Sequence, residues 1–162
     1  MRSLTWARFG LRPVGTLALI AALLGLPRPA LGSLGGDVSS VKADLTRMNG
    51  TEHVVTAGAR AVHEIQLPGG TLVREYLSAD GTVFGVTWRG PFRPNLQQLL
   101  GAYFDEFQQG AQDAKSRRAG RGPLFISGPN IVAHMAGRSR AFFGRAYIPK
   151  LMPSGSSVAD IL

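Results

Sequence analysis

The chain has 162 residues, no cysteine and a formal net charge of +8. The absence of cysteine excludes a fold that depends on disulfides, so hydrophobic burial must supply the stability. Arg2, Arg8, Arg12 and Arg28 all lie before Ser33, and the remaining 18 − 4 = 14 basic and 10 acidic residues give a net charge of only +4. That modest excess requires no nucleic-acid or anionic-lipid surface.

Residues 1–32 are typical of a secretory signal peptide that is cleaved on export. Arginines precede an uncharged run from Val14 to Leu26, and the small residues Ala30 and Gly32 fit a cleavage site after Gly32. The run is shorter than the roughly 20 residues that span a bilayer, although a retained membrane anchor is the alternative. No cysteine follows the run and no Arg-Arg pair precedes it, which excludes lipoprotein processing and argues against twin-arginine export. We therefore expect the general secretory route and a periplasmic or secreted protein.

Cleavage leaves residues 33–162, a length typical of one domain, with no further membrane span. Export also argues against nucleic acid as a partner. The first predicted element is a short amphipathic helix within residues 34–50, where apolar residues recur at helical spacing until Asn49-Gly50 supplies a stop. Residues 51–59 are rich in β-branched side chains and suggest an irregular first strand.

The strand predicted at residues 60–67 places a histidine on its apolar face. Alternation puts His63 on the same side as Ile65. We interpret His63 as a half-buried histidine hydrogen-bonded to a neighbour, because a zinc-protease motif needs a second histidine where Leu67 stands.

Two more strands follow, joined by a turn at residues 79–81, and the length of that turn decides which charged residue faces the aromatic side of the hairpin. A two-residue turn places Glu75 opposite Val86, whereas a three-residue loop with a left-handed Gly81 places Arg74 there. We favour the three-residue loop, because an arginine stem can lie along aromatic surface while its head reaches solvent or a carboxylate. The alternative interpretation makes both charges ordinary solvated sheet residues.

One amphipathic helix is predicted after Pro94, with Asn95 as its N-cap and Gln98 as its capping-box partner. Its apolar stripe is typical of a helix packed on a sheet, and consists of Leu96, Leu99, Leu100, Tyr103, Phe104 and Phe107. Gly101 lies inside this helix, and close approach of helix and sheet would explain a glycine there. We therefore expect tight packing at Gly101.

A polar stretch with a basic loop near residues 113–122 follows the helix. We interpret its four basic residues as solubilising, with binding of an anionic partner such as a phosphate or lipid head group as the alternative; they are Lys115, Arg117, Arg118 and Arg121.

Strands at residues 130–136 and 138–148 then form a C-terminal hairpin, and residues 157–162 suggest a short helical turn. The sequence around Ser139 is similar to the nucleophile elbow of serine hydrolases. That motif needs a helix after the serine and a later histidine, but the segment after Ser139 is predicted to be a strand and no histidine follows.

A series of different short motifs, in a characteristic order, extends through nearly the whole mature chain. They are Ser33-Leu34-Gly35-Gly36, Val62-His63-Glu64-Ile65, Thr71-Leu72-Val73-Arg74-Glu75-Tyr76, Gly81-Thr82-Val83-Phe84, Trp88-Arg89-Gly90-Pro91, Leu99-Leu100-Gly101-Ala102-Tyr103-Phe104, Arg140-Ala141-Phe142, Gly144-Arg145-Ala146-Tyr147 and Ile161. In this order they resemble a family of small exported bacterial proteins, the domain of unknown function numbered 2844. One departure is Gly137-Arg138-Ser139-Arg140, where the family usually has Gly-His-Met-Arg. The resemblance implies export and supplies no catalytic residues.

These elements predict an α+β domain. We expect an antiparallel sheet of about five strands, made of a meander and a C-terminal hairpin, with one amphipathic helix packed on it and a short N-terminal helix. No set of side chains fixes a reaction, a metal site or a cofactor, which makes an enzyme the less favoured interpretation.

The sequence favours a non-catalytic binding or accessory protein of the cell envelope. Its partner, an envelope protein or a small ligand, is expected at the exposed face of the sheet around Arg74, Glu75, Trp88 and Arg89, where charged and aromatic residues converge on one hairpin. One alternative is a small periplasmic hydrolase, with Glu75 and either Glu64 or Asp105 as a carboxylate pair. The other is a structural component of an envelope assembly that binds through an exposed sheet edge.

Overall fold

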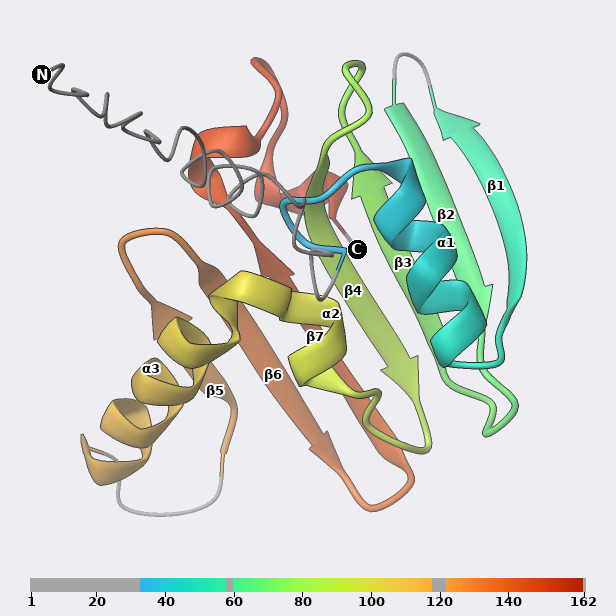
Figure 1. Ribbon diagram of the computed structural model, residues 1–162. Helices are drawn as coiled ribbons and strands as arrows, with labels where there is room; N and C mark the ends of the chain where they lie inside the picture. The colour runs from blue at the N-terminus through green and yellow to red at the C-terminus, as the bar shows by residue number, and fades with distance from the viewer. Residues whose placement is uncertain (1–32, 58–59, 118–121, 162) are drawn as a thin grey trace, which may run out of the picture.

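An antiparallel sheet of seven strands organises the part of the chain that the computed structural model describes, residues 33–57, 60–117 and 122–161 (Figure 1). Its strands lie in the order β1-β2-β3-β4-β7-β6-β5. They are β1 (Thr51–Ala57), β2 (Arg60–Gln66), β3 (Leu72–Leu77), β4 (Val83–Gly90), β5 (Leu124–Ser127), β6 (Val132–Arg138) and β7 (Ala141–Tyr147). The α+β class and the antiparallel sheet are confirmed. The predicted number of about five strands is too low, because β1 is a regular strand and β5 lies where no strand was predicted.

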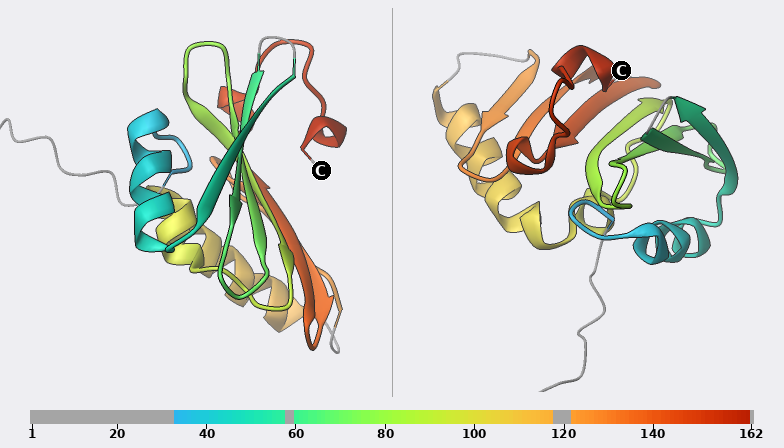
Figure 2. Two further views of the ribbon diagram at one scale, coloured as in Figure 1. Left: turned by 90° about the vertical axis from the view of Figure 1, so that its right-hand side faces the viewer. Right: turned by 90° about the horizontal axis from the view of Figure 1, so that it is seen from above.

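Helices cover one face of the sheet, which we call the inner face (Figure 2). α1 (Val38–Arg47) confirms the predicted N-terminal helix, and the side chain of Asp37 caps it by accepting hydrogen bonds from the first backbone N–H groups. α2 (Leu96–Leu100) and α3 (Phe104–Arg117) replace the single helix predicted after residue 94. No helix in these described ranges has both the length and the apolar character needed to cross a membrane.

Gly101 interrupts the predicted helix. The side chain of Asn95 accepts a hydrogen bond from the backbone N–H of Gln98 at 3.1 Å, so the predicted N-cap is confirmed. Gly101 then adopts φ 51° and ψ −121°, which favours glycine, and a 3₁₀ turn (Gly101–Tyr103) leads into α3. The glycine therefore ends α2 rather than allowing close packing within one helix. α3 extends to Arg117, so it includes the first half of the predicted basic loop, and residues 118–121 lie outside the described ranges.

The main core fills the space between the inner face and the helices. Val73, Val86 and Trp88 come from the sheet and Leu99 from α2, and all four are at most 2% exposed. The ring of Trp88 occupies the space beside Gly144 on the neighbouring strand, where a Cβ atom would collide with it. Trp88 therefore belongs to the core rather than to an exposed face.

A β-bulge at Phe84 sets the register of the β3–β4 hairpin. Ser78 N donates to Thr82 O at 2.9 Å and Gly81 has φ 82°, which confirms the predicted three-residue loop. Leu77 then pairs with Val83 but Tyr76 pairs with Gly85, so Phe84 is the extra residue. The bulge shifts every later pair by one residue, and the predicted register, with Arg74 opposite Val86, is wrong: Glu75 lies there instead.

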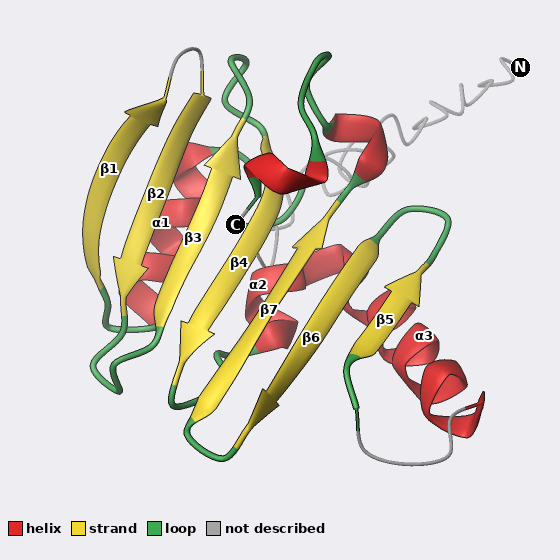
Figure 3. Ribbon diagram, turned by 180° about the vertical axis from the view of Figure 1, so that it is seen from behind, coloured by secondary structure: helices red, strands yellow, loops and turns green. Residues whose placement is uncertain are grey.

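The opposite face, which we call the outer face, is covered only in part (Figure 3). After β7 the chain forms 3₁₀ turns at Pro149–Leu151 and Val158–Asp160, and the second confirms the helical turn predicted near the end of the sequence. Ile161 packs on the outer face with Tyr76 and Phe84 in a small second core. The half of this face nearer the β6–β7 hairpin carries no covering segment in the described structure (Figure 3).

Candidate functional site

The structure divides the four predicted binding residues between the two faces of the sheet. Glu75 and Trp88 point to the inner face, where they are 0% and 2% exposed. Arg74 and Arg89 point to the outer face, where Arg74 Nε donates to Glu64 Oε1 at 2.6 Å and Arg89 is exposed. The four residues therefore do not form one site, although Arg89 belongs to an exposed surface described next.

Aromatic rings and arginines form a continuous surface on the uncovered half of the outer face. We call it the outer surface, and it consists of Arg89, Phe125, His134, Phe143 and Arg145. Arg145 lies at its margin, where it is half-buried and its Nη1 donates to Val158 O at 3.4 Å in the C-terminal turn. Cross-strand pairing brings these residues together, because Phe125 lies opposite His134, His134 opposite Arg145, and Arg89 opposite Phe143. Phe125 is 65% exposed and Phe143 is 46% exposed, and exposed aromatic rings gathered on one surface are typical of a region that contacts a partner.

The rings of the outer surface hold one another in place. Those of Phe125 and His134 stack with centroids 4.2 Å apart and planes 8° apart, and His134 meets Phe143 edge-on at 6.1 Å. Burial, followed by the nearby charge of Arg145, lowers the pKa of His134. The imidazole is therefore neutral at pH 7 and acts as a ring rather than a cation.

A groove with a strongly basic lining continues from the outer surface at the end of β4. It runs between the segment Arg89–Pro91 and the β6–β7 hairpin, which contributes Arg138, Arg140 and Phe142, and no acidic residue lines it. Within the described ranges, none of its three arginines forms an ion pair with a carboxylate.

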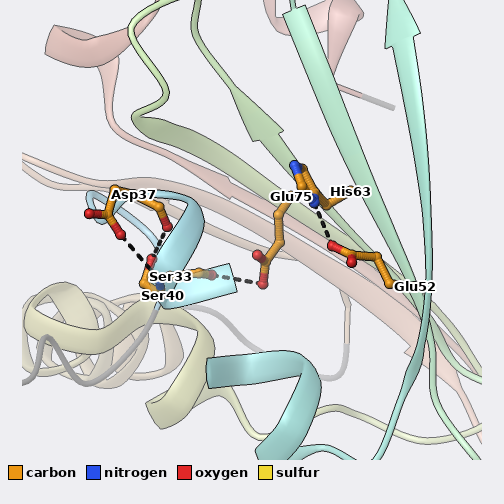
Figure 4. Close-up of polar contacts among 6 residues, drawn as sticks. All are labelled: Ser33, Asp37, Ser40, Glu52, His63 and Glu75. Carbon is orange, nitrogen blue, oxygen red and sulfur yellow. Dashed lines mark hydrogen bonds and ion pairs between the residues drawn. The ribbon is translucent and has the colours of Figure 1, made fainter. Parts of the chain in front are cut away.

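Buried polar residues form a second cluster, on the inner face (Figure 4). Ser33 Oγ donates to Glu75 Oε1 at 2.8 Å, and neither residue has any exposed surface. Burial raises the pKa of Glu75 to about 8 against the lowering effect of the Ser33 hydrogen bond, and the charges of Asp44 and Glu52 raise it as well. Glu75 is therefore largely protonated at neutral pH when its surroundings are those seen here.

Asp44 on α1 is the second buried carboxylate of this cluster. It has no exposed surface, and Gln98 Nε2 donates to its Oδ1 at 3.1 Å. Burial raises the pKa of Asp44, against lowering contributions from Gln98 and from both the hydroxyl and the backbone N–H of Ser33. Ser33 therefore acts on both carboxylates.

His63 lies at the margin of the cluster. It pairs with Glu75 across the β2–β3 ladder, and its Nδ1 is 2.5 Å from Glu52 Oε1 (Figure 4). The predicted bond to a neighbour is confirmed, whereas His63 is buried at 8% exposure rather than half-buried as predicted. No three His, Cys, Asp or Glu side chains converge on a possible metal position anywhere in the described ranges.

The buried cluster cannot contact a substrate, because Ser33, Asp44 and Glu75 have no exposed surface. The carboxylate pair of the hydrolase alternative also fails to form. Glu64 is bound to Arg74 on the outer face, whereas Glu75 faces inward, and Asp105 is exposed on α3. These carboxylates share no cleft, and a glycosidase-type pair needs one.

The sequence reasoning overlooked Ser33, Asp44 and the ring pair of β5 and β6. A signal for Asp44 was available, since it follows Val41 by three residues and therefore lies on the apolar stripe of the predicted helix. No such signal marks Phe125, because its short strand lies in a segment with no clear alternation.

Comparison with known proteins identifies the family. A family model described as "Protein of unknown function (DUF2844)" matches residues 30–161. No curated protein and no solved structure gives a significant match. The match covers nearly all of the chain outside the predicted signal peptide, which agrees with the resemblance found in the motifs. The chain belongs to the DUF2844 family.

Proposed function

We propose that this protein is an exported, non-catalytic binding or accessory protein of the cell envelope, and that it holds an acidic partner protein on its outer surface. The observation that carries the proposal is the exposed ring of Phe125, stacked on the half-buried ring of His134, beside the exposed Phe143 and two arginines. Exposed aromatic and arginine side chains are the residue types enriched at the centres of protein interfaces.

The size and charge of the region support a macromolecular, acidic partner. The outer surface extends over β4, β7, β6 and β5, a width of about 14 Å at the usual strand spacing, which is broad for a small ligand. The adjoining groove adds Arg138 and Arg140 without any acidic residue. Complementary charge at such a rim steers association more than it adds affinity, so we expect binding that weakens as salt rises.

Crosslinking in cells tests this proposal. A photoreactive phenylalanine analogue at Phe143 is compared with the same analogue at Ala102, which is exposed on the helix side of the sheet. We expect one partner to be captured from position 143 and none from position 102. Arg89→Ala with Arg138→Ala should reduce the capture several-fold without loss of folding. Equal capture from both positions, or none from position 143, refutes the proposal.

The structural-assembly alternative has an observation of its own. Within the described part of the chain, β1 forms one edge of the sheet and pairs only with β2, and it exposes Val54 and Val55, at 46% and 40%. An open edge strand can accept a strand from another chain. A third crosslinker position at Val54 distinguishes the two functions, because capture from residue 54 alone favours assembly through the edge.

A further inference from the structure

Two buried carboxylates on the inner face each have an oxygen with no hydrogen-bond partner in the described structure. These atoms are Asp44 Oδ2 and Glu75 Oε2. An unsatisfied buried acceptor is costly, and two neighbouring buried carboxylates without a cation are more so. The cluster described above therefore lacks donors, and it lacks positive charge.

The charged groups around the cluster do not supply what is missing. Glu52 adds a third carboxylate, and His63 already directs its Nδ1 to Glu52. Arg47, at the end of α1, influences Asp44 only through its charge, and the guanidinium belongs to an exposed residue. The polar residue nearest both carboxylates is Ser33, which donates its hydroxyl to Glu75 at 2.8 Å and whose presence lowers the pKa of Asp44.

The position of Ser33 in the sequence supplies a cation. The small residues at 30 and 32 predict signal-peptide cleavage after Gly32, and that cleavage makes Ser33 the first residue of the mature protein. Water breaks the peptide bond, Gly32 leaves with the new carboxylate, and Ser33 keeps the nitrogen as an α-amino group, which becomes an ammonium by taking up a proton. One amide N–H is thereby replaced by three N–H donors and a positive charge.

We propose that the α-ammonium group of Ser33, released by cleavage after Gly32, is the buried counter-ion of Asp44 and Glu75. Two independent observations meet at this residue: the cleavage pattern in the sequence, and the hydrogen bond of Ser33 to Glu75 in a cluster where Glu75 Oε2 and Asp44 Oδ2 have no partner. The two donors gained on cleavage equal the two acceptors that lack a partner. A neighbouring carboxylate also favours the charged form of an amine.

Backbone hydrogen bonds hold Ser33 at this position. Leu34 N donates to Leu99 O at 3.1 Å, Gly35 N donates to Val83 O at 2.8 Å, and Val83 N donates to Gly36 O at 2.8 Å. The segment after Ser33 is thus attached to both α2 and β4. The ammonium is delivered to the carboxylates by a fixed piece of backbone rather than by a flexible side chain, which keeps the entropic cost of the ion pair low.

The test uses the exported protein itself. N-terminal sequencing should read Ser-Leu-Gly-Gly, and acylation of the folded protein at pH 7 should modify the exposed Lys42 and Lys150 while sparing the α-amine. Insertion of one alanine between Gly32 and Ser33 moves the ammonium away and leaves an amide at Ser33. We expect this variant to unfold on the order of 10 °C lower, the loss usual when one partner of a buried pair is removed, and its α-amine to react.

A double variant separates charge from packing. The double variant Asp44→Asn, Glu75→Gln makes the cluster neutral. In this background the exported and alanine-inserted forms should unfold at the same temperature. In the background of the exposed control Asp105→Asn, the difference in unfolding temperature between the two forms should remain. A different N-terminus, equal unfolding temperatures in the wild-type background, or a difference that persists in the double variant overturns the inference. The inference shares with the proposed function only the assumption of export, and loss of outer-surface binding leaves it untouched.

Discussion

Glu75 makes a prediction about the pH dependence of stability that can be worked out from the structure. The perturbation is Glu75→Gln in the alanine-inserted protein, where Ser33 carries the amide seen here. Burial raises the pKa of Glu75 to about 8, above its ordinary value of 4.5. The folded state then binds a proton that the unfolded state has released, so the free energy of unfolding falls as pH rises between these two values.

The size of the effect follows from the shift. Each pH unit in the middle of this range costs about 1.4 kcal/mol, so about 3 kcal/mol is lost between pH 4.5 and pH 7, and about 4 kcal/mol by pH 8. Glutamine at residue 75 has no proton to lose and should remove this slope. In the exported protein that begins with Ser33, the ammonium opposes the shift and the slope should be shallower.

The assay is urea denaturation from pH 5 to pH 8, with Asp105→Asn as the matched control because Asp105 is exposed. We expect the alanine-inserted protein to lose stability steadily across this range and its Glu75→Gln variant to lose less, with only the contribution of Asp44, whose pKa burial also raises, left in place. A variant with the same slope as its parent, or a parent that becomes more stable as pH rises, shows that the buried carboxyl does not behave as described.

Three further predictions concern packing and hydrogen bonding and are measured by denaturant unfolding. Trp88→Ala should cost about 3–5 kcal/mol, because the ring fills the core beside Gly144; a loss below about 1 kcal/mol contradicts that placement. Gly144→Ala should cost about 1–3 kcal/mol by overpacking against the same ring, and an unchanged midpoint is the contrary result. Glu106→Ala should cost about 2 kcal/mol, since its carboxylate accepts bonds from Asn130 N at 2.9 Å and Ile131 N at 3.2 Å. Burial raises the pKa of Glu106, but these hydrogen bonds outweigh burial and hold the pKa below 4.5. The stability that the Glu106 carboxylate contributes should therefore vanish as pH falls below 4.5. A Glu106→Ala loss that persists in acid argues against this role of the carboxylate.

Short sequence patterns correctly predicted the caps and turns that form through contacts between neighbouring residues. Asn95 as an N-cap, the left-handed Gly81 and the helical turn near the C-terminus all follow from short-range chemistry. The pattern at Gly101 was ambiguous, because a glycine between two apolar helical segments suits close packing as well as a break. The positive φ that ends α2 comes from the way the two segments pack, which no local pattern contains.

The candidate site was harder to predict because it depends on one non-local feature. The turn of the β3–β4 hairpin was predicted, but the bulge at Phe84 depends on outer-face contacts with Tyr76 and Ile161. That one extra residue exchanges the directions of Arg74 and Glu75. Arg89 was identified from the sequence. Phe125 was not, because it belongs to the outer surface only through the pairing of β5 with the rest of the sheet.

The attachment of residues 34–36 to β4 and α2, together with the proposed cleavage after Gly32, also imposes an order of events in time. Gly35 and Leu34 are made early, yet their backbone partners, Val83 and Leu99 respectively, come much later in the chain. Until those partners have emerged, Ser33 has nothing to dock against and the bond on its amino side is open to a peptidase. Docking removes that access, because Ser33 then has no exposed surface. The proposed cleavage must therefore come before folding is complete, and a chain that folds first would keep Asp44 and Glu75 without the proposed ammonium.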